Sequence, residues 1–89
     1  MNMNEQRYKV NKGFILQEIE KEIVIFDSES SVLFSFNETA SFIFKRLKKG
    51  QEPEKIARSL AKTYEVSEVV ALKDVKNLIG KLVKKDIIS

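Results

Sequence analysis

The sequence contains no cysteine, no histidine and no tryptophan among its 89 residues. Without thiols and imidazoles, the chain offers no disulfide, no thiol nucleophile, no imidazole base and no soft-metal site. Catalysis would need paired carboxylates or a lysine, and the acidic residues are scattered over expected turns and helix exteriors. We therefore predict a protein that is not an enzyme, has no catalytic residue and uses neither a metal nor a cofactor.

Proline and glycine are also rare, with one Pro and three isolated Gly, so no glycine-rich phosphate loop is present. A chain of this length forms one small domain with little room for an enclosed active site, which favours a binding module. The longest apolar runs, such as Ile23 to Phe26, are too short to cross a membrane, and the N-terminus lacks the apolar core of a signal peptide. We expect a soluble cytoplasmic protein that does not bind membranes.

Charge is unevenly divided along the chain, although the net charge is only +3. Residues 14–36 carry five acidic residues and one lysine, whereas residues 37–89 carry twelve basic and seven acidic residues. This division is compatible with a nucleic-acid surface, but it is more often a solvated lysine-rich exterior.

The first half of the chain has the pattern of β-strands. Stretches rich in Ile, Val and Phe at residues 14–19 and 23–26 predict two strands joined by a tight hairpin. A turn of Asp and Ser side chains leads to a third strand at residues 31–36, whose side chains alternate between two faces. Residues 1–13 lack periodicity and are expected to form a flexible N-terminus before a single domain at residues 14–89.

The second half has the pattern of helices. Asn37 is expected to end the third strand and cap a helix at residues 38–49, because its side-chain oxygen can accept a bond from the first turn. A second helix is expected from Pro53, and a third after the N-cap Ser67. The apolar arc of the third helix is wider than one neighbouring element needs, and its members are Ala71, Leu72, Val75, Leu78, Ile79, Leu82 and Val83. The predicted fold is α+β, a three-stranded antiparallel meander followed by three helices, the last two in helix-turn-helix order.

Helix-turn-helix order raises DNA binding as an alternative function. A recognition helix reads bases with Arg, Asn or Gln near its N-terminus, whereas the third helix begins Glu68-Val69-Val70. Its lysines could contact phosphate without specifying sequence. A DNA-binding regulator would show steep salt dependence.

The third strand suggests a different function, because in a meander it lies at an edge of the sheet. Residues 31–36 include neither a charge nor a proline to protect that edge. A helix or a second copy could cover it; alternatively, an extended peptide could add to it. In the last case Leu72, Val75, Ile79 and Val83 would supply side-chain pockets.

A family resemblance rests on motifs spread over nearly the whole chain from Phe14. The run Phe36-Asn37-Glu38-Thr39-Ala40, preceded by Glu22 to Asp27, resembles the PqqD-like family. Further similarities are Gly50, Ile56-Ala57, Leu60, Tyr64 to Val66, Asp74-Val75, Leu78-Ile79, Leu82 and Ile87-Ile88. The sequence differs at Phe36, where the family often has Leu, and at Asp86, where Gly commonly precedes the last apolar pair. Neither departure is expected to touch the groove directly.

The resemblance implies a winged-helix-like RiPP recognition element, a domain that binds precursor peptides of ribosomally made, modified natural products. The leader segment of the precursor would add antiparallel to the third strand, in a cleft against the third helix, for delivery to a radical SAM enzyme or a leader peptidase. The implied contacts are Ser31, Val32, Leu33, Phe34 and Ser35 on the strand and Leu72, Val75, Lys76, Ile79 and Val83 on the helix, with Leu78 at the cleft floor.

Self-pairing through the same edge would compete with the leader, so a monomer or weak homodimer is expected. The resemblance does not choose among quinone-cofactor, lasso-peptide and thioether-peptide pathways.

Overall fold

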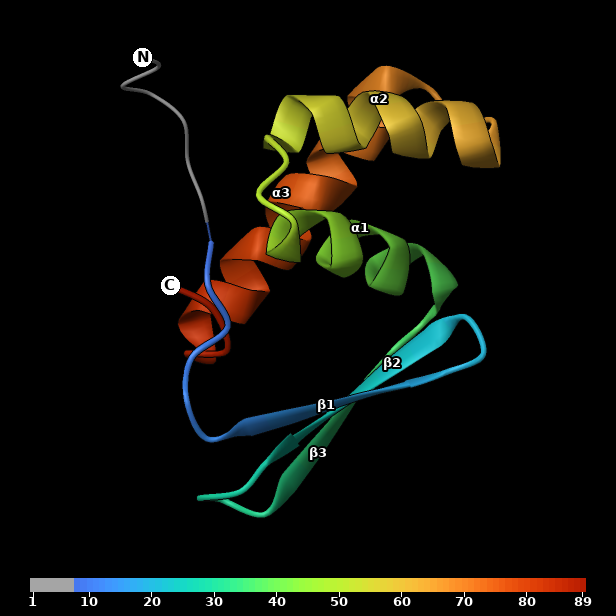
Figure 1. Ribbon diagram of the computed structural model, residues 1–89. Coiled ribbons are helices and arrows are strands. Elements are labelled where there is room, and N and C mark those ends of the chain that lie inside the picture. Colours follow the sequence, from blue (N-terminus) through green and yellow to red (C-terminus); the bar gives the residue numbers. More distant parts are fainter. Residues whose placement is uncertain (1–7) are drawn as a thin grey trace.

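The computed structural model describes residues 8–89 as an antiparallel sheet in the order β1-β2-β3 with three helices on one side of it (Figure 1). The elements are β1 (Phe14–Ile19), β2 (Glu22–Asp27), β3 (Val32–Phe36), α1 (Glu38–Lys48), α2 (Pro53–Tyr64) and α3 (Glu68–Lys84). The predicted fold is confirmed. Asn37 caps α1 and Ser67 caps α3, each accepting a bond from a backbone N–H of the first turn. Ser31, predicted to lie in the third strand, instead has a φ of 61° in the turn before β3.

The pairing of β2 with β3 decides which face of the sheet meets the helices. Ile23 pairs with Phe36 and Ile25 with Phe34, and both isoleucines are buried in the core. Residues directly opposite in a sheet share a face, so the two phenylalanines also point toward the helices. The other face of the sheet is open, and Leu33 on that face is 63% exposed.

The turn before β3 is held by Asp27, as the Asp and Ser cluster predicted. Its carboxylate accepts bonds from the backbone N–H groups of Glu29, at 3.0 Å, and Ser30, at 3.4 Å. Hydrogen bonding from the Ser30 side chain lowers the pKa of the Asp27 carboxyl below its ordinary value. Because the folded-state pKa is lowered, the stabilisation is present above the unfolded pKa and is lost as pH falls through the folded one.

Ser41 in α1 joins the ends of β2 and β3. This fully buried hydroxyl accepts a bond from the backbone N–H of Ile23 at 2.9 Å and donates to the carbonyl of Phe36 at 3.2 Å. The chain leaves the sheet at Phe36 to begin α1, and the hydroxyl therefore connects the two strands where they diverge.

Replacing Ser41 with alanine is expected to destabilise the fold by about 1–3 kcal/mol, because the buried N–H of Ile23 would lose its partner. Urea unfolding followed by circular dichroism would measure the change. Ser35→Ala, which removes an exposed hydroxyl from β3, is the matched control and is expected to stay within about 0.5 kcal/mol of the parent. Equal stabilities for the two variants would contradict the bridging role of Ser41.

Both ends of the described chain join the same corner of the fold. Ile87 and Ile88 are buried in the core. Residues Lys9 to Asn11 pair with residues 87–89 through backbone hydrogen bonds and the Val10–Ile88 bridge. Residues 9–11 therefore belong to the folded domain, which corrects the boundary predicted at residue 14. Residues 1–7 of the predicted flexible N-terminus lie outside the described residues. Asp86 has a φ of 58°, in the left-handed region that glycine adopts more readily than other residues.

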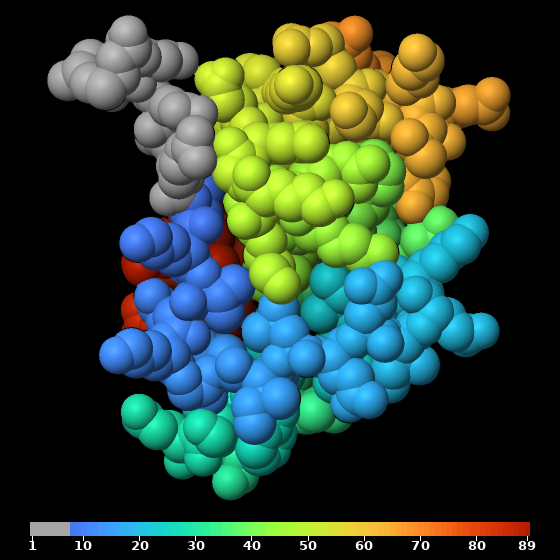
Figure 2. Space-filling model, in the orientation of Figure 1, coloured from blue at the N-terminus to red at the C-terminus, as the bar shows by residue number. Residues whose placement is uncertain are grey.

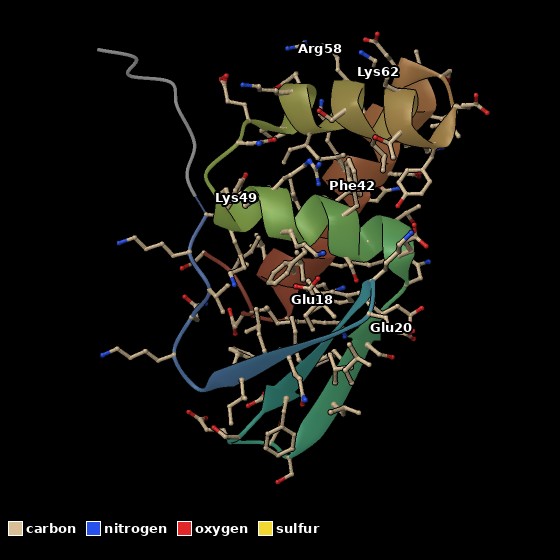
Figure 3. The ribbon with its side chains drawn as sticks, turned by 45° about the vertical axis from the view of Figure 1, so that its right-hand side comes forward. Glu18, Glu20, Phe42, Lys49, Arg58 and Lys62 are labelled. Atoms are coloured by element: carbon tan, nitrogen blue, oxygen red, sulfur yellow. The ribbon has the colours of Figure 1, made fainter. Side chains whose placement is uncertain are left out.

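Phe42, which lies off the apolar stripe of α1, is positioned between α1 and α2 (Figure 3). Its ring packs edge-on against Tyr64 at 5.6 Å, and the Arg46 guanidinium lies 3.5 Å from its centroid. The Tyr64 hydroxyl donates to the Glu38 carboxylate at 2.9 Å, and burial together with this bond raises the pKa of Tyr64. The cluster fixes α2 against α1 and takes no part in the cleft described below.

Candidate functional site

The sheet has two edge strands, and the register identifies the backbone groups that each leaves unpaired. Ile19 and Glu22 close the first hairpin as a hydrogen-bonded pair, and such pairs alternate along an antiparallel ladder. Even-numbered residues of β2 therefore bond to β1, and odd-numbered residues bond to β3. On β3 the partners of this ladder are Val32, Phe34 and Phe36. Leu33 and Ser35 consequently direct their N–H and C=O groups away from the sheet.

The opposite edge, β1, is protected by an inward-pointing charge. Glu18 lies on the core-facing side of β1 and forms an ion pair with Lys45 of α1 (Figure 3). A hollow of about 550 Å³ lies between β1 and α1, and its rim also includes Lys48 and Lys49. Figure 2 shows this face, with the blue atoms of β1 below the yellow-green end of α1. Inward charges of this kind block the addition of a foreign strand, and residues 32–36 of β3 contain none.

A cleft of about 440 Å³ runs beside β3 on the helix side of the sheet. It is lined by Leu33, Phe34, Ser35, Phe36, Asn37, Ala40, Leu78, Lys81, Leu82, Lys85 and Ile87. One wall is the uncharged strand, the floor is apolar, and the opposite wall is the C-terminal half of α3. An extended chain placed along β3 would thus meet free backbone groups on one side and apolar side chains below.

The direction of α3 along the cleft follows from contacts at its two ends. Leu78 lines an adjoining hollow together with Asn37 and Ala40, which follow the C-terminal end of β3. The Lys85 ammonium lies 5.2 Å from the centroid of the Phe34 ring, nearer the start of the strand. The helix therefore runs in the direction opposite to β3.

Of the strand residues predicted to contact a peptide, Leu33, Phe34 and Ser35 line the cleft. Val32 does not line it, and Ser31 lies in the preceding turn with its N–H bonded to the carbonyl of Asp27. The useful edge is therefore shorter than the predicted one.

The helix residues predicted to contact a peptide fall into three groups: one lines the cleft, one is buried in the core, and four lie outside the cleft. Leu78 lines the cleft as predicted, whereas Val75 is fully buried in the core, so its assignment to a peptide-binding surface is corrected. The remaining four, Leu72, Lys76, Ile79 and Val83, do not line the cleft, and Leu72 lies instead in a hollow against α2. A helix turns about 100° per residue, so positions 72, 76, 79 and 83 lie on one flank of the buried stripe and positions 78, 81 and 85 on the other.

Sequence reasoning missed Lys81, Lys85, Ala40, Leu82 and Ile87. Lys81, Leu82 and Lys85 follow Leu78 at intervals of three, four and seven residues, the spacing of one helix face, which would have found them once Leu78 was chosen. Phe36 is a further correction, because it lines the cleft and packs edge-on against Phe44 at 5.6 Å.

Other chemistries find less support in the described part of the chain. Residues 8–89 contain no group of three or more acidic side chains placed to hold a metal ion. Within the same residues, no helix is long and apolar enough to span a membrane. The start of α3 presents Val69, which is 79% exposed, and Val70, 49% exposed, where a DNA-reading helix would carry hydrogen-bonding side chains.

Comparison with known proteins gives a consistent picture. The model of one family, described as coenzyme PQQ synthesis protein D (PqqD), matches residues 22–88. Among solved structures, lasso peptide synthetase B1 complexed with the leader peptide is 24% identical with a TM-score of 0.87, covering 94% of this chain and 99% of that one. TbiB1 in complex with the TbiA(beta) leader peptide is 21% identical with a TM-score of 0.81, covering 91% and 94%. No curated protein matches the sequence significantly.

Proposed function

The chain belongs to the PqqD family, and from this premise we propose that it is a non-catalytic adaptor that captures the leader segment of a ribosomally made precursor peptide. The leader adds as an antiparallel strand to β3 and fills the cleft against α3. The observation that carries the proposal is the pairing of an unprotected sheet edge with an apolar cleft of about 440 Å³. Two similar folds that were solved with leader peptides support it.

The short edge limits what backbone pairing contributes to binding. Leu33 and Ser35 together offer two donors and two acceptors, and each bond contributes about 1 kcal/mol net. Four such bonds correspond to a dissociation constant of about 1 mM before any entropic cost. Tighter binding must therefore come from leader side chains in the cleft, where burying one large apolar side chain contributes about 1.5–3 kcal/mol.

The adaptor presents the captured peptide to a maturation enzyme, either a radical SAM enzyme or a leader peptidase. The outer face of the sheet and the β1 edge remain accessible on residues 8–89 when β3 is occupied. The family description points toward quinone-cofactor synthesis and the similar solved structures toward lasso peptides. Each pathway predicts a different kind of gene beside that of the adaptor.

Amide NMR tests the proposal directly. The full chain, labelled with nitrogen-15, is titrated with synthetic leader peptides of short precursor genes found beside its own gene. The expected shifts are largest at Leu33 and Ser35 and along the cleft-facing flank of α3 at Leu78 and Lys81. Shifts concentrated on β1, or on the flank with Ile79, would contradict the proposed site. Saturable, salt-sensitive binding to DNA without any response to leaders would favour the winged-helix regulator.

A further inference from the structure

Two lysines, Lys81 of α3 and Lys85 at the C-cap of that helix, form the only charged wall of the β3 cleft among residues 8–89. Both are exposed and line the cleft, and neither has an ion-pair partner within the described chain. Asp74 is the acidic residue in the adjoining hollow that Lys81 also lines, and it is not paired with that lysine. The facing strand, residues 32–36, is uncharged, so the cleft itself supplies no neutralising carboxylate.

Building on the proposed function, we propose that Lys81 and Lys85 select leaders with acidic side chains at alternate positions. The Lys85 N–H donates to the carbonyl of Lys81 at 3.0 Å, so Lys85 lies one helical turn after Lys81, on the same face and about 6 Å further along the helix axis. Alternate residues of an extended strand are separated by about 6.7 Å and point to the same side. Two carboxylates at positions i and i+2 of the leader therefore match the spacing of the two ammonium groups, and charge-assisted bonds are the stronger kind.

The direction of the helix fixes where the acidic positions lie in the leader. Leu78 and Ala40 form the apolar end of the cleft near the C-terminus of β3, and Lys85 lies over Phe34 at the other end. An antiparallel leader passes the Leu78 end first. The cleft-facing residues of the leader thus read, in chain order, an apolar residue, an Asp or Glu two residues later, and a second Asp or Glu four residues after the apolar one. The intervening residues face the open side of the sheet beside Leu33 and are not read by the lysines.

A displayed library of random peptides, long enough to span the cleft, tests the inference with three forms of the full chain. The parent is expected to enrich the apolar-x-acidic-x-acidic pattern. Lys81→Glu/Lys85→Glu is expected to enrich Lys or Arg at the same positions. Lys84→Glu is the control, because it changes charge on the same helix at a residue outside the cleft, and it is expected to retain the parental preference.

Calorimetry with one enriched peptide adds a quantitative readout. Replacing its acidic residues with Asn or Gln is expected to weaken binding to the parent by about tenfold, with little effect on binding to Lys81→Glu/Lys85→Glu. If the parent enriches apolar peptides without acidic preference and still needs the β3 edge, the lysine inference is overturned and the adaptor function stands. If neither the library nor the neighbouring leaders bind, both are overturned.

Discussion

Replacing Leu33 with proline is expected to weaken leader binding by well over tenfold while leaving the domain folded. The Leu33 N–H points away from the sheet, so proline removes a donor that only an added strand would use. No ladder bond between β2 and β3 is lost, because the pair formed by Phe26 and Leu33 is a non-hydrogen-bonded one. The fixed φ of proline also disturbs the edge locally. Isothermal titration with a leader peptide measures the loss.

Two controls separate the donor from other effects of the substitution. Leu33→Ala keeps the N–H and removes the exposed side chain, and it is expected to bind within a few-fold of the parent. Leu16→Pro removes the corresponding outward donor of β1, where the Glu18–Lys45 pair protects the edge, and it should also leave leader affinity nearly unchanged. A larger loss of leader affinity in Leu16→Pro than in Leu33→Pro would indicate that the peptide binds at the β1 edge instead.

Local patterns were sufficient to predict the elements of this fold. Alternation in the three strands, the caps Asn37 and Ser67 and the proline at the start of α2 each act within a few residues, and the structure agrees with all of them. The status of β3 as an edge followed from the order of a three-stranded meander. The unprotected edge strand was thus identifiable from sequence periodicity and chain order.

The helix side of the cleft was less predictable because it depends on how α3 is rotated. An arc from Ala71 to Val83 is apolar over more than one face, and sequence alone does not say which flank turns toward β3. The structure buries the middle of the arc, including Val75, and turns Leu78 toward the strand and Val83 away from the cleft. Long-range pairing was also missed: residues 9–11 join the C-terminus across more than seventy residues, and no local pattern marks that contact.

Because the orientation of α3 turns Leu78 toward β3, a second large effect on leader binding is expected from substitution of Leu78. Replacing Leu78 with aspartate is expected to weaken leader binding by about thirtyfold or more, because a carboxylate would take the place of the apolar anchor at one end of the cleft. Ile79→Asp is the matched comparison, since Ile79 is also partly buried but lies on the flank away from β3. It is expected to lower the free energy of unfolding while the folded fraction keeps near-parental affinity.

Circular dichroism of the two variants measures folding, and calorimetry measures leader affinity. Together they show which flank of α3 contacts the leader. Leu78→Ala and Ile79→Ala replace the aspartate variants if either of those fails to fold. Leu78→Ala should still weaken leader binding several-fold, because it leaves part of the apolar floor of the cleft unfilled. Loss of leader binding in a folded Ile79 variant, with Leu78 variants unaffected, would place the peptide on the flank that carries Leu72 and Val83. Positions 78 and 79 are adjacent in sequence, so their local helix context is nearly the same. Opposite effects of the two substitutions on leader binding would therefore result from the direction in which each side chain faces.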